Sequence, residues 1–214
     1  GGEYLPEGLK DRLLAMAAPY IPLDGVNEKG LSVGVLQLSI PPTNQDRGLT
    51  DITTTAAIRM ILDKCATVDE AVEMLGQYDM HASANACYHF QIADAQGQSV
   101  VVEYIEDEMS LVYSETPYQW CTNFILTEGA YFNNGGGQDR YQSLAEDLDA
   151  CGGVLESESQ AMEFLSNCQN PTHLGDEGQQ TGTLWSAVYN NTDAALTLCL
   201  KTDYETVYTY SLSD

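Results

Sequence analysis

The sequence predicts a single domain of the α+β class over residues 1–214, with two stacked sheets covered by helices on their outer sides. The expected elements come in blocks: a strand, two helices, several strands, two helices and a final set of strands. This order differs from the regular alternation of βαβ folds. The run Val100-Val101-Val102 is apolar at every position, as in a strand buried on both faces. The chain shows no internal repeat and no linker.

Hydrophobic periodicity gives the individual elements. The predicted strands cover residues 31–38, 88–93, 99–104, 109–113, 118–126, 184–189, 194–200 and 206–211. The predicted helices cover residues 7–18, 54–65, a segment that begins after Thr67, residues 139–151 and a segment that begins after Ser157. Polar or glycine-rich loops are expected over residues 40–48, 129–137 and 170–181, where they would line a pocket.

Local signals support several of these boundaries. Gly30 ends the turn before the first strand, where glycine can adopt a positive φ. Thr67 and Glu70 have the spacing of a capping box. The loop over residues 40–48 contains adjacent prolines, which cannot join a β-ladder. A lid over a pocket and a plain connector are both compatible with this loop.

The charge of the chain excludes some classes of partner. Lys and Arg number 8 and Asp and Glu number 32, which gives a net charge of −24. Nucleic acid is not expected as a partner, because its phosphates are neutralised by clustered cations. A membrane is not expected either, since no apolar run approaches the roughly 20 residues that cross a bilayer. We expect an acidic soluble protein, either cytoplasmic or exported.

The titratable side chains give no cofactor or metal signature. None of the six cysteines forms a C-x-x-C pair, and none of the three histidines has metal-ligand spacing. In a chain of this length, buried free thiols are favoured over disulfides. His89 lies in a predicted strand and is interpreted as a packed core residue. The sequence contains no phosphate-binding or dinucleotide motif, so no cofactor is predicted.

Three polar residues stand out in unexpected environments. Arg140 is in the first turn of its predicted helix, where a cation opposes the helix dipole. Either a structural ion pair or a role in orienting an anion or a thiolate would explain it. Asn123 and Gln37 lie in apolar strands, where an amide must find hydrogen-bond partners. Each is either a structural hydrogen bonder or a donor to an oxyanion.

Five segments occur in a particular order along nearly the whole chain. The first is DGVNEKGLSVGV at residues 24–35. The others are residues 67–75, residues 99–104 followed by Cys121-Thr122-Asn123, the triplet Asp139-Arg140-Tyr141, and residues 183–189. In this order they resemble the choloylglycine hydrolases and penicillin V acylases, with the related acyl-CoA:6-aminopenicillanate acyltransferase-like proteins.

The resemblance implies a four-layer αββα N-terminal nucleophile hydrolase. Such an enzyme would cleave a linear amide in a small molecule: an N-acyl amino acid, a bile salt or a penicillin V-like compound. The nucleophile would be a cysteine at the mature N-terminus. Its own α-amino group titrates near neutrality and can accept the thiol proton. Family members are often oligomeric, which leaves a homo-oligomer open.

The resemblance also assigns roles by position. Asn123 would support the tetrahedral intermediate, and Arg140 would lie beside the nucleophile. Gln37 falls where bile-salt hydrolases have an oxyanion-hole asparagine, and glutamine can also donate. The residues assigned to substrate binding are Asn27, Phe124 and Tyr131, although Asn27 is most simply a turn residue.

One part of the family pattern has no counterpart in these residues. The family's N-terminal strand carries the cysteine, followed by an arginine and an aspartate, but the first cysteine here is Cys65. We therefore expect the nucleophile to come from a missing N-terminal segment or a separate chain. The 214 residues alone are then expected to be inactive. The alternatives are an acyltransferase of the same family and a non-catalytic binding domain.

Overall fold

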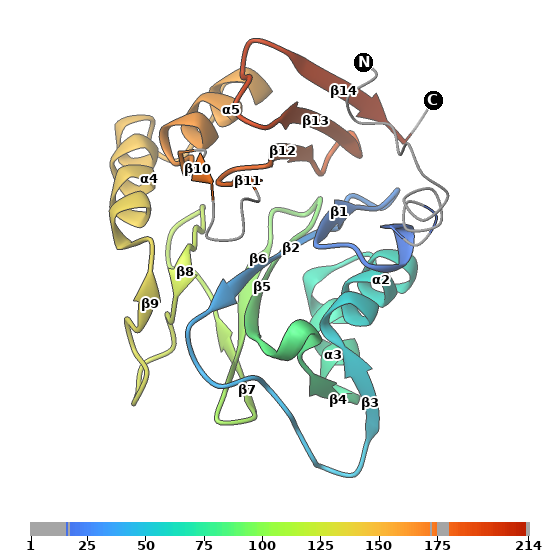
Figure 1. Ribbon diagram of the computed structural model, residues 1–214. Coiled ribbons are helices and arrows are strands. Elements are labelled where there is room, and N and C mark those ends of the chain that lie inside the picture. The colour runs from blue at the N-terminus through green and yellow to red at the C-terminus, as the bar shows by residue number, and fades with distance from the viewer. Residues whose placement is uncertain (1–15, 17, 172, 175–179, 213–214) are drawn as a thin grey trace.

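Two main sheets organise the computed structural model, which describes residues 16, 18–171, 173, 174 and 180–212 (Figure 1). The larger sheet is antiparallel, with the strand order β1-β2-β5-β6-β7. Its strands are β1 (Asp24–Val26), β2 (Ser32–Leu38), β5 (Cys87–Ala93), β6 (Ser99–Ile105) and β7 (Glu108–Val112). The smaller sheet contains β12 (Trp185–Asn190), β13 (Ala195–Leu200) and β14 (Val207–Ser211). Mixed helices and antiparallel sheets confirm the predicted α+β class.

Helices lie against each sheet (Figure 1). α2 (Thr54–Lys64) and α3 (Val68–Gly76) cover one face of the larger sheet and enclose the main hydrophobic core. α4 (Gln138–Ala150) precedes α5 (Glu158–Asn167), which packs on β12. Two short 3₁₀ helices cover Ala18–Tyr20 and Ser83–Asn85. Within the described ranges, no helix is long and apolar enough to cross a membrane.

The local sequence signals are confirmed where the structure describes them. Gly30 has a φ of 74° and donates its backbone N–H to the Asn27 carbonyl, at 3.0 Å. The Thr67 hydroxyl caps α3 by accepting from the Glu70 N–H, at 3.2 Å. The Ser157 hydroxyl caps α5 in the same way. The predicted helix over residues 7–18 lies almost entirely outside the described residues.

The predicted strand over residues 118–126 is wrong for most of its length. Only Asn123–Phe124 forms a strand, β8, which pairs with Gly135–Gly136, β9. The preceding residues are held to the larger sheet by side chains instead of a ladder. Gln91 Nε2 donates to the Gln119 carbonyl at 3.0 Å, and Cys121 Sγ donates to Gln91 Oε1 at 3.2 Å. The predicted loop over residues 170–181 contains a short pair, β10 (His173–Leu174) and β11 (Gln180–Thr181).

Sequence periodicity also missed a parallel pair of strands, β3 (Thr50–Thr53) and β4 (Tyr78–His81). Each strand has four residues, too few for a clear alternation. We call residues 40–49, which lead into β3, the strap. The strap is joined to β4 by backbone hydrogen bonds, from Gln45 N to the Met80 carbonyl and from Ala82 N to the Thr43 carbonyl.

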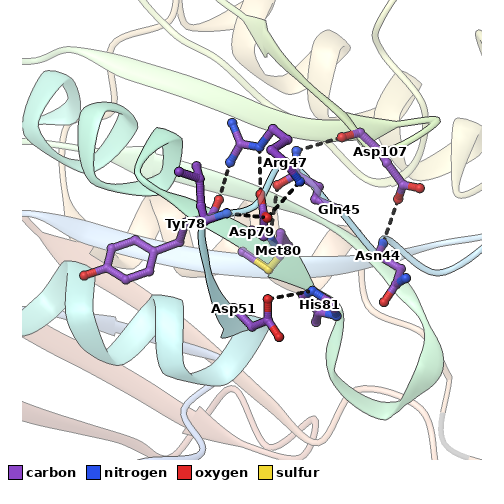
Figure 2. Close-up of polar contacts among 10 residues, drawn as sticks. Asn44, Gln45, Arg47, Asp51, Tyr78, Asp79, Met80, His81 and Asp107 are labelled. Atoms are coloured by element: carbon purple, nitrogen blue, oxygen red, sulfur yellow. Dashed lines mark hydrogen bonds and ion pairs between the residues drawn. The ribbon is translucent and has the colours of Figure 1, made fainter.

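Buried polar side chains fix the strap in place (Figure 2). Asp79 is 1% exposed, and its carboxylate accepts the backbone N–H groups of Arg47 and Leu49 at 2.8 and 3.0 Å. It also accepts Arg47 Nε at 2.8 Å, and the Arg47 guanidinium reaches the Tyr78 carbonyl as well.

Gln45, a residue of the strap, is 2% exposed, and its side-chain amide makes further contacts that hold the strap (Figure 2). It accepts the Met80 N–H at 3.0 Å and donates to the Asp107 carbonyl at 2.7 Å. Buried polar groups satisfied from both sides are typical of a rigid segment. The strap is therefore a fixed connector and not a lid.

The Asp79 carboxylate makes part of the stability dependent on pH. Burial raises the pKa of Asp79, but the hydrogen bonds from Leu49 and Arg47 outweigh it and leave the pKa below its usual value. A lowered folded pKa stabilises the protein above the unfolded pKa, near 3.9, and this stabilisation is lost as pH falls through the folded value. We expect Asp79→Asn to lower the urea midpoint at pH 7 and to flatten its fall below about pH 4.

The matched control is Asp63→Asn, which removes an exposed aspartate paired with Arg59 on α2. Its urea midpoint should follow the wild type across the same pH range, because exposed ion pairs contribute little. Parallel curves for wild type and Asp79→Asn would contradict a stabilising role of the Asp79 carboxylate.

Candidate active site

A cleft with a volume of about 560 Å³ lies between the two sheets. Gly34, Leu36 and Gln91 line it from the larger sheet, and Trp185 and Tyr189 line it from the smaller one. The Trp185 indole N–H donates to the Asp24 carboxylate at 2.8 Å and so joins the sheets at the edge of the cleft. Arg140, Thr122, Cys121 and Cys168 also line the cleft, so its wall carries a cation as well as the Asp24 carboxylate.

The structure brings together the two residues most strongly predicted to carry chemistry. Arg140 Nη2 donates to Asn123 Oδ1 at 2.9 Å, and Asn123 Nδ2 donates to the Gln37 backbone carbonyl at 3.0 Å. The chain thereby links α4, β8 and β2. Arg140 is half-buried and has no carboxylate within ion-pair distance among the described residues. An ion pair with another described residue therefore does not explain why an arginine stands in the first turn of α4.

This arrangement strengthens Asn123 as a hydrogen-bond donor. A guanidinium that donates to the amide oxygen draws electron density from the amide, because hydrogen bonds in a chain polarise one another. Asn123 Nδ2 carries two hydrogens, and the structure uses one of them on the Gln37 carbonyl. The second is available to stabilise a developing negative charge on a ligand oxygen.

The glycine-rich loop before α4 allows this close approach. Gly137 has a φ of 87°, and a Cβ there would lie 2.5 Å from Arg140 Nη2 and 3.1 Å from Thr122 Oγ1. The Thr122 hydroxyl donates to the Gly137 carbonyl at 2.9 Å. A Cβ at Gly135 would lie 2.1 Å from the Asn123 carbonyl oxygen. The contacts of Thr122 and Gly137 beside Arg140 were not predicted, although the run Gly135-Gly136-Gly137 was the available signal.

Replacing Gly137 by alanine should displace Arg140 from Asn123. The guanidinium is the flexible end of a side chain, so it is expected to move while the fold persists. We expect kcat on an amide substrate to fall about tenfold or more, because small displacements of catalytic groups are costly. Steady-state kinetics of Gly137→Ala and Gly152→Ala would measure this. Gly152 has a φ of 64° and open space around it, so an equal loss in both variants would contradict the steric argument.

Gln37 and Asn27, two further predicted site residues, have surroundings that differ from those of Asn123. The Gln37 side chain is exposed, and it shares strand parity with Val33 and Val35, which pack toward the helices. Only the Gln37 backbone carbonyl meets Asn123, so its role as an oxyanion donor stays a prediction. Asn27 is 6% exposed, and its amide spans the turn and the end of α2. It donates to the Leu62 and Cys65 carbonyls and accepts from two N–H groups in its own turn.

Phe124 and Tyr131 lie away from the residues that line the cleft. Phe124 is 6% exposed and makes an edge-to-face contact with Tyr141, with ring centroids 5.0 Å apart. Tyr131 packs on a small cluster formed by Leu38, Cys87 and Ile125. Both side chains support the β8 segment, and their assignment to substrate binding stays a prediction.

The cysteines in the cleft are poorly suited to nucleophilic attack. Burial raises the pKa of Cys121 to about 12, and the nearby Glu103 carboxylate contributes in the same direction. Burial also raises the pKa of Cys168. A thiolate is the reactive form of cysteine, and reactive cysteines have lowered pKa values. Cys65, Cys87 and Cys199 likewise have raised pKa values, each mainly because of burial.

Solved structures identify the fold class. The chain is similar to a variant of conjugated bile acid hydrolase from Clostridium perfringens, with a TM-score of 0.68 and 15% identity over 89% of this chain and 73% of that one. It is also similar to penicillin V acylase from Agrobacterium tumefaciens, with a TM-score of 0.63 and 20% identity over 92% and 68% of the two chains. The protein therefore shares the mixed α and β fold of these two solved structures.

Sequence comparison gives the family within this class. The family described as acyl-coenzyme A:6-aminopenicillanic acid acyl-transferase matches residues 19–204, and the chain belongs to it. A penicillin V acylase from Pectobacterium atrosepticum is 34% identical over 130 residues, which is 53% of this chain. The match covers 34% of that acylase, so the chain spans about a third of this relative. The predicted relationship to penicillin V acylases and bile acid hydrolases is confirmed.

Proposed function

We propose that this protein forms the larger part of a cysteine amidohydrolase that cleaves a linear amide in a small molecule. The hydrogen bond from Arg140, which lines the cleft, to Asn123 carries the proposal, because it places a polarised donor next to a cation of the cleft. The names of the relatives agree with it, since a penicillin V acylase and a conjugated bile acid hydrolase both act on amides.

The nucleophile is a cysteine outside the described cleft residues, with its own α-amino group as the base. Support comes from the raised pKa values of Cys121 and Cys168, which leave the cleft without a ready thiolate. An N-terminal amine with a pKa near neutrality accepts the thiol proton without help from another side chain.

The reaction follows from these groups. The thiolate attacks the amide carbonyl carbon, and the carbonyl electrons move onto the oxygen. Asn123 Nδ2 donates its second hydrogen to that oxyanion, while Arg140 holds the amide in position. The protonated α-amino group gives its proton to the leaving nitrogen as the C–N bond breaks. Water then attacks the thioester, and the carboxylic acid leaves as the thiol forms again.

An apolar surface that the described residues leave partly exposed supports a docking place for the segment that carries the nucleophile. Leu196, Leu198 and Leu200 point away from α5 and border a cavity of about 470 Å³ beside β1. On the same sheet, Trp185 is 38% exposed and Tyr210 is 56% exposed. Extended apolar surfaces of this kind mark interaction sites. The segment packs between the sheets and completes a four-layer αββα sandwich.

The second candidate is an acyltransferase, in which an amine replaces water as the acceptor of the acyl group. The description of the matching family as an acyl-transferase favours it. The two reactions share the same acyl-enzyme and differ only in its fate. Product analysis with and without added amine acceptors distinguishes them, because transfer would yield a new amide in place of the free acid.

The test uses the complete product of the gene. The protein is incubated with phenoxymethylpenicillin, a glycine-conjugated bile acid and an N-acyl amino acid, and the released acids are measured by mass spectrometry. We expect release of at least one acid, together with alkylation of an N-terminal cysteine by iodoacetamide and a parallel loss of activity. No polypeptide beginning with cysteine, together with no acid released, would refute the proposal and favour a binding domain.

A further inference from the structure

A buried pair of ionisable side chains joins two neighbouring strands of the larger sheet. His89 on β5 and Glu103 on β6 are both 0% exposed, and His89 Nδ1 lies 3.1 Å from Glu103 Oε1. A carboxylate oxygen only accepts, so Nδ1 carries the hydrogen. The prediction that His89 is a packed core residue is confirmed, but it did not include the carboxylate partner. A buried charge without a function is costly, so the remaining contacts of Glu103 are informative.

The Glu103 carboxylate holds the backbone that follows Asn123. Oε1 accepts the Leu126 N–H at 3.0 Å, and Oε2 accepts the Thr127 N–H at 2.8 Å. Burial raises the pKa of Glu103, but the hydrogen bonds from His89, Leu126 and Thr127 outweigh it, and the pKa lies below its usual value. The Glu103 carboxylate is therefore ionised and holds two successive backbone N–H groups, those of Leu126 and Thr127. We call this pair of hydrogen bonds the clamp.

The clamp fixes a stretch of backbone that lies just beyond a very short strand. β8 is only Asn123–Phe124, and the same chain segment ends in the two amides that Glu103 accepts. Ile125, 0% exposed, packs on Leu38 and Cys87 between Asn123 and the clamp. Ile125 also exchanges backbone hydrogen bonds with Asn133 and Asn134, so the clamp and these bonds together hold the backbone that follows Asn123.

We propose that Glu103, oriented by His89, is a positioning residue that sets the location of Asn123 relative to Arg140 and the Gln37 carbonyl. The inference rests on the proposed function for its catalytic consequence, but its structural part stands on these contacts alone. Glu103 does not touch the substrate. It determines whether Asn123 Nδ2 lies where an oxyanion develops.

Glu103→Gln is the decisive variant because it keeps the shape and removes one acceptor. Glutamine has one oxygen and one NH₂ group, so one of the two backbone N–H groups would face a donor. We expect kcat on the amide substrate to fall by up to about 10²-fold with little change in KM, because the loss comes from misplacement of Asn123. The side-chain amide resonance of Asn123 in ¹⁵N-labelled protein is expected to shift.

Glu70→Gln is the matched control, because Glu70 is an exposed glutamate whose carboxylate also accepts a backbone N–H, that of Ala66. It should leave both kcat and the Asn123 resonance unchanged. His89→Asn, which retains a donor near the Nδ1 position, is the second variant in case Glu103→Gln does not fold. His89→Asn should shift the Asn123 side-chain amide resonance by less than Glu103→Gln does.

The two readouts separate the possible failures. If the wild type releases no acid, the proposed function fails, yet a shifted Asn123 resonance in Glu103→Gln still supports the positioning role. An unchanged resonance in a folded Glu103→Gln or His89→Asn protein overturns the inference. A loss of kcat without a shift of the Asn123 resonance also overturns it, since the loss would then have another cause.

Discussion

Replacing Arg140 by alanine is expected to lower kcat for amide hydrolysis by about 10²–10³-fold, the effect of removing one oxyanion-stabilising group. Without the guanidinium, Asn123 Oδ1 loses its 2.9 Å hydrogen bond, so the amide is no longer polarised and keeps only its bond to the Gln37 carbonyl. KM should change little, because the interaction strengthens mainly in the transition state. Asn123→Ala should have a comparable effect, and the double variant should lose little more, since the two residues act as a unit.

Steady-state kinetics of the complete enzyme would test this expectation. Arg59→Ala is the matched control, because Arg59 forms an exposed pair with Asp63 on α2 and lies outside the cleft. It should retain wild-type kcat. Arg140→Lys keeps the charge but loses the planar donor group, so it should recover only part of the activity. Independent, fully additive losses in Arg140→Ala and Asn123→Ala would contradict a coupled pair.

Replacing Gly30 by alanine is expected to destabilise the fold by roughly 2–5 kcal/mol, the sum of a left-handed backbone and a forced contact. Gly30 has a φ of 74°, and a Cβ there would lie 1.9 Å from the Asn191 carbonyl oxygen. Asn191 belongs to the turn between β12 and β13, so the contact joins the smaller sheet to the turn before β2. The backbone oxygen cannot move without moving that turn.

Gly97→Ala separates the two contributions to this loss. Gly97 has a φ of 82° and nothing within 4 Å of the added Cβ. It should cost only the roughly 1–2 kcal/mol of the left-handed conformation. Chemical denaturation of both variants would give the difference. Equal free energies of unfolding for Gly30→Ala and Gly97→Ala would contradict the close contact between Gly30 and Asn191.

Short-range chemistry was the part of this structure that the sequence predicted well. A capping hydroxyl at Thr67, a positive φ at Gly30 and the strand over residues 88–93 depend mainly on residues nearby in the sequence, and all three are confirmed. Arg140 and Asn123 were selected because each is unusual in its local environment. Their mutual hydrogen bond, across 17 residues, required the folded chain.

The remaining features depend on contacts between distant residues. Glu103 accepts amides 23 and 24 residues away, and Asp79 accepts from Arg47 and Leu49, about 30 residues before it. Among so many acidic residues, neither carboxylate could be distinguished by composition. Residues 123–125 pair with residues 133–136 through the backbone, whereas the N–H groups of Leu126 and Thr127 are accepted by the Glu103 side chain. Hydrophobic periodicity does not show which backbone N–H groups have a side chain as their hydrogen-bond partner.

The apolar side chains that the described residues leave exposed on the β12–β14 sheet affect how the chain behaves in solution. At low ionic strength, a net charge of −24 keeps molecules apart, and the exposed Trp185, Tyr208 and Tyr210 rarely meet those of a neighbour. Added salt shortens the range of this repulsion to a few ångströms near 1 M. The same salt strengthens burial of apolar surface when its ions are kosmotropic. Solubility should therefore be greatest in dilute buffer, the reverse of salting-in.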